Sequence, residues 1–415
     1  MDSTVVRLLF MFLLLGEVIG DRRLKYVTVL YRHGDRSPVK AYPTDKYKES
    51  AWPQGFGQLS QEGMRQHFEL GLLLRQRYQG FLNDTYDRHE IYVRSTDVDR
   101  TLMSAEANLA GLYPPNGSQV FDPKLKWQPI PVHTVPQEEE RLLSFPIPGC
   151  PRYEVLMNET ERSEIFINMT NQYEDLIKLV QEKTGLKNTN IESVWSVHDT
   201  LFCEAKHNMT APDWVTPEVM DGLTTLKDFG FRILFEVYKQ KEKSRLQGGV
   251  LLGSIVKNIS ESTNPNSSQR RKMMMLSAHD TTIVALQSSL GVFNGQQPPY
   301  ASCHIFELYL EDNGSFTVAM FYRNDTTSVL YQITLPGCDL FCPVEDFMRI
   351  TKPFIPENWE AECMVESSTK DTKVIIGLAV CGTLLILVIL LLLALLCRQQ
   401  ERSDGYSHIH SESES

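Results

Sequence analysis

Three short clusters of charged residues each follow an apolar run that is typical of a buried strand. The clusters occupy residues 32–38, 94–100 and 278–280. In an open α/β sheet, ligands bind outside the carboxyl ends of the strands, so we expect the three clusters to meet there. The cations that would form a positive pocket are Arg32, Arg36, Arg100 and His279. Because planar guanidinium groups match phosphate oxygens with paired hydrogen bonds, this pocket predicts a phosphate site.

A phosphate pocket needs a nucleophile, and the candidate is His33, which lies between two arginines. No P-loop, Gly-x-Ser-x-Gly or Cys-x5-Arg motif stands at the end of a predicted strand. An imidazole nitrogen attacks phosphorus only when it is unprotonated, and adjacent cations lower the pKa of a histidine. Gly34 leaves room for close approach of the backbone. We therefore predict that His33 is the catalytic nucleophile.

The leaving alkoxide needs a proton, and Asp280 is the carboxyl group beside the second histidine at a strand end. A protonated carboxyl group donates best at low pH, which predicts an acidic optimum. The dipeptide His198-Asp199 looks similar, but no apolar strand precedes it. We therefore predict a structural role for that dipeptide.

The elements that must position these residues alternate between strand and helix. Strands are predicted at 25–31, 91–95 and 273–277, each followed by a loop and then by helices that begin at residues 60, 101 and 281. A hairpin is predicted from 303–310 and 316–322, closed around Asp312, Asn313 and Gly314. This order predicts an α/β sheet with an antiparallel edge. Residues 128 to 245 read as an inserted, mostly helical cap.

Composition limits the function classes. The chain has 415 residues, 42% of them hydrophobic, a formal net charge of −11 and a pI near 5.5. A packed core is expected, and disorder is excluded. Nucleic acid is a poor partner, because its binding depends on clustered Lys and Arg.

Two apolar segments do not belong to the folded domain. Residues 1–20 read as a signal peptide, with Arg7 before a short apolar run; an N-terminal strand or anchor helix is the alternative. Residues 374–397 carry no charge and are long enough for a transmembrane helix. A cleaved leader would place residues 21–373 in the lumen and residues 398–415 in the cytosol.

Sequons and cysteines also indicate the secretory pathway. All nine Asn-x-Ser/Thr sequons precede the predicted span, at Asn83, Asn116, Asn158, Asn168, Asn208, Asn258, Asn266, Asn313 and Asn324. Six cysteines also lie in the predicted lumen, an even number that predicts disulfides. Cys338 and Cys342 could form half of a metal site, but no second thiol or His pair lies near them in sequence, and a short disulfide loop is preferred.

The segment RHGDRSP at 32–38 resembles the RHGxRxP signature of the histidine acid phosphatases. Further blocks resemble the vertebrate prostatic and lysosomal members of this family and together cover nearly the whole luminal part. They lie at residues 52–60, 92–112, 127–136, 245–252, 277–282 and 298–309. The block around His198 departs from the family, in which a Tyr is expected.

The resemblance implies a phosphoglycerate-mutase-like mixed sheet flanked by helices, with a smaller helical cap. It also implies a homodimer and hydrolysis of phosphate monoesters through a phosphohistidine, without metal or cofactor. His33 would be the nucleophile and Asp280 the proton donor. The residues that would hold phosphate are Arg32, Arg36, Arg100 and His279. The family's disulfide pairing would join Cys150 to Cys363, Cys203 to Cys303 and Cys338 to Cys342.

The span and tail favour a lysosomal, single-pass type I protein over a secreted one. In the tail, Tyr406 and Ile409 form a Tyr-x-x-apolar segment that a trafficking adaptor could bind while it is extended; an inert tail is the alternative. Two rival functions remain. One is a plasma-membrane ecto-phosphatase of testicular type, acting on nucleotides or phosphoproteins. The other is a receptor or adhesion module that kept the fold without the activity.

Overall fold

The centre of the fold is a seven-stranded mixed sheet whose order is β2-β3-β1-β4-β5-β6, with β7 paired to β5. Its first three strands run parallel and the others antiparallel, so the predicted sheet with an antiparallel edge is confirmed. The computed structural model describes residues 22–265, 270–324, 330–365 and 369–411. The strands are β1 (Arg23–Arg32), β2 (Ile91–Ser95), β3 (Met273–Ala278), β4 (Cys303–Leu310), β5 (Phe316–Arg323), β6 (Tyr331–Ile333) and β7 (Cys342–Pro343).

The register of the parallel strands brings their carboxyl ends level. Arg32 of β1 lies opposite Ala278 of β3, and Ser95 of β2 lies opposite Ser277. The strand that comes last in the chain, β3, lies between the other two. The three polar clusters therefore follow the strands at the same end of the sheet, as the sequence predicted.

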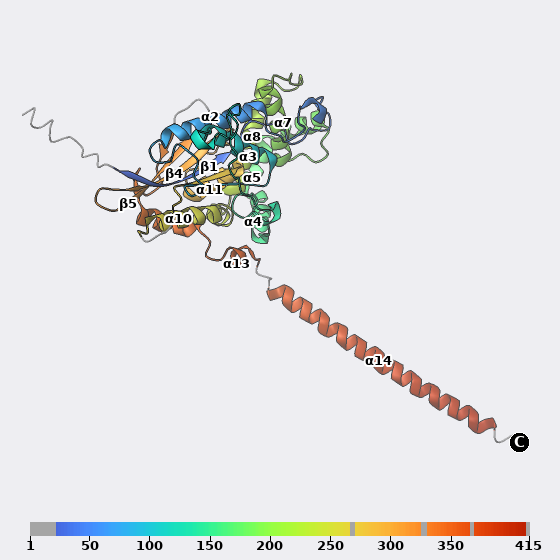
Figure 1. The fold of residues 1–415 in the computed structure, drawn as a ribbon. Coiled ribbons are helices and arrows are strands. Elements are labelled where there is room, and N and C mark those ends of the chain that lie inside the picture. The colour runs from blue at the N-terminus through green and yellow to red at the C-terminus, as the bar shows by residue number, and fades with distance from the viewer. Residues whose placement is uncertain (1–21, 266–269, 325–329, 366–368, 412–415) are drawn as a thin grey trace, which may run out of the picture. The chain divides into compact units, whose positions relative to one another are not determined.

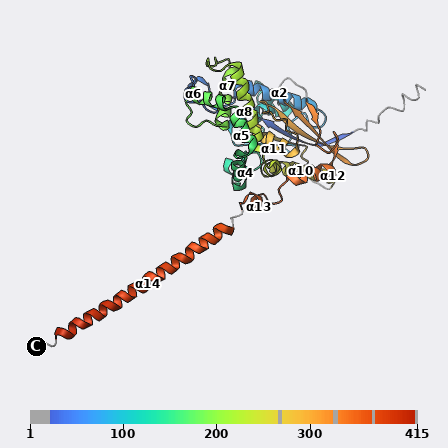
Figure 2. The ribbon, with the colours of Figure 1, turned by 180° about the vertical axis from the view of Figure 1, so that it is seen from behind.

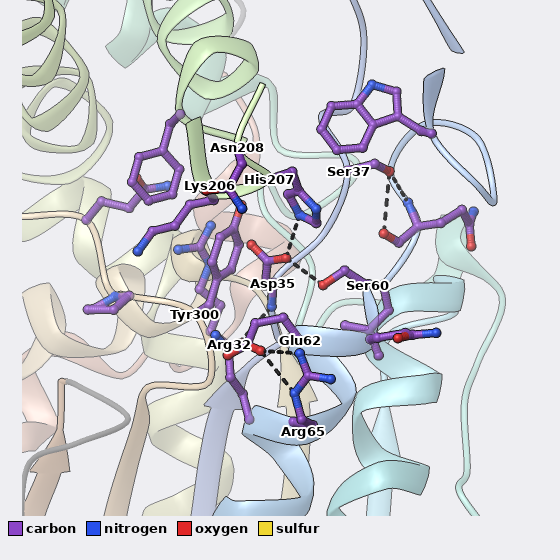
Figure 3. A pocket seen from close by; sticks show the side chains of 18 of the residues that line it. Arg32, Asp35, Ser37, Ser60, Glu62, Arg65, Lys206, His207, Asn208 and Tyr300 are labelled. Carbon is purple, nitrogen blue, oxygen red and sulfur yellow. Dashed lines mark hydrogen bonds and ion pairs between the residues drawn. The ribbon is translucent and has the colours of Figure 1, made fainter. Parts of the chain in front are cut away.

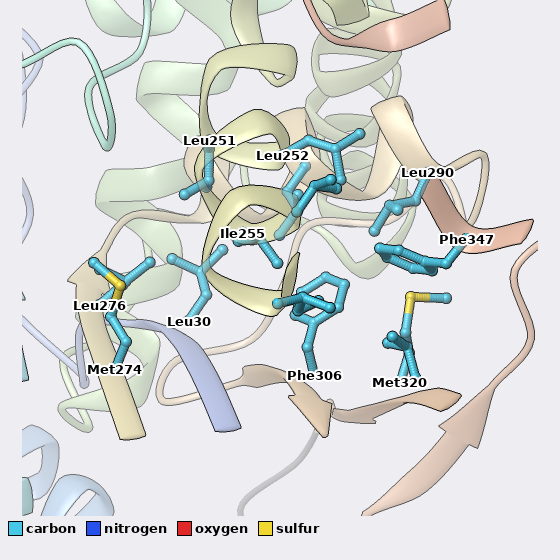
Figure 4. Close-up of a cluster of buried hydrophobic side chains, with 14 of the residues drawn as sticks. Leu30, Leu251, Leu252, Ile255, Met274, Leu276, Leu290, Phe306, Met320 and Phe347 are labelled. Carbon is cyan, nitrogen blue, oxygen red and sulfur yellow. The ribbon is translucent and has the colours of Figure 1, made fainter. Parts of the chain in front are cut away.

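Both faces of the sheet are buried, because the side chains of β1 alternate between two apolar clusters. Tyr26 and Leu30 pack on one side, where α10, α11 and α12 cover the sheet. Val27, Val29 and Tyr31 pack on the other, beneath α2 and α3. Helices α2 and α10 lie on opposite sides of the sheet in Figure 1 and again in the reversed view of Figure 2. Figure 4 shows α10 side chains above the strands.

The covering helices begin close to the residues that the sequence indicated. Ser60 caps α2, accepting a hydrogen bond from the backbone nitrogen of Gly63 at 3.0 Å. Arg75 and Arg77 lie in its last turn, where cations stabilise a helix. The bounds are α2 (Gln61–Arg77), α3 (Asp99–Leu112), α10 (Gly249–Thr263), α11 (Asp280–Leu290), α12 (Val344–Thr351) and α13 (Trp359–Cys363).

The predicted cap is helical, but its helices begin later than expected. Residues 128–150 contain one short 3-10 helix, Gln137–Glu139, so this first part of the predicted, mostly helical insertion is not itself helical. Its prolines lack the N–H that a helix interior requires, and His133 instead pairs with Arg94 beside β2. The cap helices are α4 (Pro151–Glu161), α5 (Glu164–Gln172), α6 (Glu174–Thr184), α7 (Ile191–Lys206), α8 (Pro217–Phe235) and α9 (Gln240–Gln247).

Two of the three expected disulfides are present, Cys150–Cys363 and Cys338–Cys342. The pairing of Cys203 with Cys303 is absent, and both thiols are free and buried. Cys303 packs in the apolar cluster beneath α2 and α3. Cys203 on α7 instead has its sulfur 3.6 Å from Nη1 of Arg36.

Most sequons that the structure describes lie on the surface. The exposed asparagines are Asn83, Asn116, Asn158, Asn168, Asn208 and Asn313. Asn258 and Asn324 are half-buried, and Asn258 donates to the sulfur of Met274 at 3.3 Å. Asn266 lies outside the described residues, as does the predicted signal peptide.

Residues after Cys363 form a separate unit. In the part of the chain that the structure describes, one helix is long and apolar enough to cross a membrane, over Ile376–Arg398, near the predicted span. This helix, α14 (Thr369–Ser411), continues through residues 406–409, a segment that is expected to be extended when an adaptor binds it. Once nucleated by the apolar stretch, a helix adds residues at little further cost, and no proline interrupts the tail.

The contact between α2 and the loop after β1 gives a testable prediction. A Cβ on Gly63 would meet the carbonyl oxygen of Asp35 at 2.2 Å, and one on Gly34 would meet that of Gly63 at 2.4 Å. Since backbone atoms cannot rotate away, Gly63→Ala should destabilise the protein by about 1 to 3 kcal/mol. Thermal unfolding of the full chain measures this loss.

The matched control is Gly222→Ala in α8, where the new Cβ would meet only the flexible end of Leu176, at 2.7 Å. Because Ala favours a helix over Gly by about 1 kcal/mol, this control should be neutral or stabilising. Equal melting temperatures for Gly63→Ala and the unmodified protein would contradict the close packing described here.

Candidate active site

Five of the six predicted site residues line one cavity of about 250 Å³. These five are His33, Arg36, Arg100, His279 and Asp280. The sixth, Arg32, faces an adjoining cleft of about 1390 Å³ and reaches the cavity through an ion pair. The clusters that follow β1, β2 and β3 therefore meet, as their level strand ends require.

The orientation of His33 leaves one ring nitrogen available for attack. Its Nδ1 lies 2.8 Å from the carbonyl oxygen of Gly34. A carbonyl oxygen only accepts, so Nδ1 carries the proton and Nε2 carries the lone pair. Burial lowers the pKa of His33 well below its usual range, and Arg100, Arg32, Arg36 and His279 lower it further. Burial is thus a larger cause than the cations that the sequence suggested, and the ring stays neutral in acid.

The loop that carries His33 is fixed from two helices. The backbone nitrogen of Gly34 donates to Oγ of Ser104 on α3 at 3.1 Å. Nε2 of His67 on α2 donates to the carbonyl oxygen of Arg32 at 2.9 Å. With Gly34 packed against Gly63, these contacts hold the imidazole ring in place.

Arg36 is held by a residue that the sequence argument set aside. Asp199 on α7 receives both terminal nitrogens of Arg36, with Nη2–Oδ1 and Nη1–Oδ2 distances of 2.9 and 3.0 Å. His198 instead contacts Thr224 within the cap. The structural role expected for this dipeptide thus extends, at Asp199, to a contact with a predicted site residue. The ion pair is bidentate and nearly buried, so it fixes the plane of the guanidinium group.

Three guanidinium groups keep unused donors. The Nε atoms of Arg32, Arg36 and Arg100 are buried, and none has a hydrogen-bond partner among the residues that the structure describes. A buried donor without an acceptor costs about 1 to 3 kcal/mol. Arg36 and Arg100 line this cavity, so an oxyanion bound there would give their guanidinium groups an acceptor, which makes phosphate the expected ligand.

The positive charge of the cavity is only partly compensated. Burial lowers the pKa of Arg100 to about 10, and the nearby Arg36 adds to this effect. Nε2 of His279 lies 3.0 Å from the hydroxyl oxygen of Thr96, and burial lowers the pKa of this histidine to about 3. A neutral His279 still carries one N–H donor.

Asp280 is held by three donors at the start of α11. Its Oδ2 lies 2.9 Å from Nη2 of Arg32 and 2.8 Å from Nε2 of Gln297, and Oδ1 accepts from the backbone nitrogen of Thr281 at 2.7 Å. Burial alone would raise the pKa of Asp280. The charge of Arg32 and the hydrogen bond from Gln297 outweigh burial, and the pKa falls below its usual value.

The larger cleft runs between the loop after β1 and cap helix α7 (Figure 3). In its wall, Asp35 bonds to Nε2 of His207 at 2.8 Å and to the hydroxyl group of Ser60. Tyr300 packs on the guanidinium group of Arg32, whose Cζ lies 4.2 Å from the ring centre. The cleft borders the small cavity at Arg32, Asp280 and Gln297, and it has room for the organic part of a substrate.

Sequence reasoning missed four residues of this site: Thr96, Asp199, Gln297 and Tyr300. Thr96 lies inside the cluster 94–100 that the sequence did identify, so its place after a predicted strand could have indicated that it belongs to the site. The other three lie in the cap or in the loop before β4, far in sequence from the residues they contact. No local pattern marks such contacts.

Comparison with known proteins adds independent findings. The chain is 56% identical to the lysosomal acid phosphatase of Rattus norvegicus over 402 residues, which cover 97% of this chain and 95% of that protein. The Homo sapiens protein of the same name is also 56% identical, over 94% of this chain and 91% of its own length. The prostatic acid phosphatase of Mus musculus is 50% identical over 86% of this chain and 94% of its own length.

Solved structures agree on the fold. A phytase of Hafnia alvei superimposes with a TM-score of 0.63 at 17% identity, covering 83% of this chain and 99% of the phytase. The histidine phosphatase superfamily (branch 2) matches residues 23–323, which include every predicted catalytic and phosphate-binding residue. The chain therefore belongs to the histidine phosphatase superfamily, branch 2.

Proposed function

We propose that this protein is an acid phosphatase of the lysosome that hydrolyses phosphate monoesters through a phosphohistidine on His33. Its identity to lysosomal acid phosphatases over nearly the whole chain supports the activity. The observation that carries the mechanism is the position of His33, whose ring has a free Nε2 and shares its cavity with buried, unpartnered guanidinium donors.

In the first step, Nε2 of His33 attacks phosphorus and the bond to the leaving oxygen breaks. The ring then carries phosphate on Nε2 and a proton on Nδ1, and the carbonyl oxygen of Gly34 stabilises this cation by accepting from Nδ1. Charge on the phosphoryl oxygens is met by donors aimed into the site beforehand, which are Arg32, Arg36, Arg100 and His279.

Asp280 gives its proton to the leaving oxygen, so that an alcohol departs. In the second step, Asp280 takes a proton from water, the water oxygen attacks phosphorus, and the bond to Nε2 breaks. Inorganic phosphate leaves, and both His33 and protonated Asp280 are restored.

The ion pair between Arg32 and Asp280 connects substrate binding to this proton transfer. Phosphate oxygens compete with Oδ2 of Asp280 for Nη2 of Arg32, which lie 2.9 Å apart in this structure. When phosphate takes the guanidinium group, Asp280 loses its strongest opposing charge and its pKa rises. Substrate binding in acid therefore favours the protonated donor.

The cellular part of the proposal rests on the terminal segments. A leader at residues 1–20 and a span near Ile376–Arg398 support a type I protein with nine luminal sequons. The family resemblance implies a homodimer without metal or cofactor, and the net charge of −11 argues against a nucleic-acid partner. A plasma-membrane ecto-phosphatase is the second candidate, and the tail decides between them. In that tail, Tyr406 and Ile409 are proposed to bind a trafficking adaptor.

His33→Ala should abolish turnover, because the covalent step has no other nucleophile. The protein is mixed with labelled substrate and quenched rapidly under conditions that preserve an acid-labile phosphohistidine. Labelled phosphate should then be found on His33 of the unmodified protein and on no residue of the variant. Thermal unfolding serves as the control for folding. Phosphate on Ser or Cys, or no phosphoenzyme at all, would show that the proposed mechanism is wrong.

Arg36→Lys should lower kcat/KM by at least about tenfold and weaken inhibition by inorganic phosphate. Lysine keeps the charge, but it cannot bind both oxygens of Asp199 and still offer the Nε edge to phosphate. The matched control is Arg349→Lys, because Arg349 is exposed, pairs with Asp346 in the same helix and lines neither cavity. If the two variants were equally active, Arg36 would act only as a point charge.

Tyr406→Ala should leave catalysis unchanged and raise the amount of protein at the cell surface, since the adaptor pocket for the tyrosine stays empty. Surface biotinylation of both forms measures this change, and Tyr47→Ala in the luminal part is the control for loss of a tyrosine as such. Unchanged surface levels with normal lysosomal delivery would remove Tyr406 from sorting.

A further inference from the structure

Gln297 connects the proton donor to the cap. It lies in the loop between α11 and β4, where its backbone nitrogen donates to Oδ1 of Asp228 on α8 at 3.0 Å. Asp228 is also paired with Lys227, 2.8 Å away. From this anchored backbone, the side-chain amide of Gln297 reaches Oδ2 of Asp280 at 2.8 Å. The amide is thus held against the carboxylate from one side.

The same loop also holds the cation that pairs with the donor. The carbonyl oxygen of Pro298 accepts from Nη1 of Arg32 at 2.6 Å, while Nη2 of Arg32 lies 2.9 Å from Oδ2 of Asp280. Oδ2 therefore has two partners in the free protein, Arg32 and Gln297. Only Arg32 is also a phosphate ligand in the proposed function, so Gln297 is the partner that stays when substrate binds.

An amide nitrogen has protons but no acceptor capacity, so its bond to Oδ2 has a defined effect. Donation to a carboxyl oxygen stabilises the ionised form over the protonated form and makes the group a stronger acid. It also fixes which lone pair of Oδ2 is occupied, leaving the side vacated by Arg32 for the proton. Asp280 itself lines the cavity that contains His33.

We propose that Gln297 is a positioning residue for the reaction, and that its amide aims Oδ2 of Asp280 at the leaving oxygen and assists release of the proton. This inference rests on the proposed function, in which Asp280 protonates the leaving group. Gln297 touches no reacting atom and acts through Asp280 alone. Other charged groups also face Asp280, and they are Arg32, Arg36, Arg100 and His279.

The test compares the full-length unmodified protein with Gln297→Leu on one alkyl phosphate and 4-nitrophenyl phosphate, from about pH 3.5 to about pH 7.5. The measured quantity is the ratio of the kcat values for the alkyl and aryl esters. Because the aryl leaving group needs little protonation, the ratio follows Asp280, while effects on His33 or on binding largely cancel. Asp280→Asn gives the reference without a donor, where the ratio should be low and independent of pH.

We expect the ratio for Gln297→Leu to fall about tenfold in acid, since the donor is less well aimed and is a weaker acid. Its midpoint should move up by about one pH unit, because a lost hydrogen bond to the carboxylate raises the pKa of Asp280. Gln297→Glu has the same shape, and its neutral carboxyl group still donates in acid. It should therefore recover the ratio at the lowest pH and lose it as the second carboxylate ionises.

The matched control is Gln296→Leu, a substitution of the same kind at an exposed neighbour, and it should not change the ratio. Equal losses for both esters with an unmoved midpoint would mean that Gln297 only supports the loop, and would overturn the inference. Trapping of phosphate on His33 distinguishes a failure of the Gln297 inference from a failure of the proposed function. If the unmodified protein carries phosphate on His33 but the ratio does not respond, only the role of Gln297 is wrong; without that phosphoenzyme, the proposed function itself is wrong.

Discussion

The level carboxyl ends of three parallel strands are the constraint on which the site depends. Arg32 opposite Ala278, and Ser95 opposite Ser277, place three polar clusters at one sheet edge. A slip of one residue in either pair would turn alternate side chains of a doubly buried strand toward the wrong layer. Burial of both faces therefore fixes the register, and the register brings His33, Arg100 and Asp280 to one cavity.

The cations gathered at the carboxyl ends of these strands repel one another, and the cap supplies part of the compensating negative charge. The charge of Arg36 is compensated by Asp199 on α7, and that of Arg32 by Asp280. Arg100 lies among these groups, and its pKa is lowered. The carboxylates hold the guanidinium groups by their terminal nitrogens, and the Nε donors have no partner in the described part of the chain. The stability of the cluster and its readiness for an oxyanion thus come from the same ion pairs. Burial and positive charge also keep His33 unprotonated in acid.

The parts of the fold that follow from local pattern were predictable. The apolar strands, the hairpin of β4 and β5 and the start of α2 at Ser60 each depend on neighbours in the sequence. Within the predicted, mostly helical cap, residues 128–150 are not helical, because their prolines favour the extended course that His133 follows beside β2. Cys203 and Cys303 are both free in the structure, although the family resemblance implied that they pair.

For the site, the sequence by itself determined the reacting groups and the class of ligand. His33, Asp280 and the arginines stand at the ends of apolar strands, and side-chain chemistry together with the sheet rule links them to phosphate. Only the tertiary structure decided which ring nitrogen of His33 is free, that Asp199 holds Arg36, and that Gln297 holds Asp280. These contacts join residues that are 163 and 17 positions apart, or depend on the rotation of one ring. Chain folding brings such partners together, and no local periodicity records the distance between them.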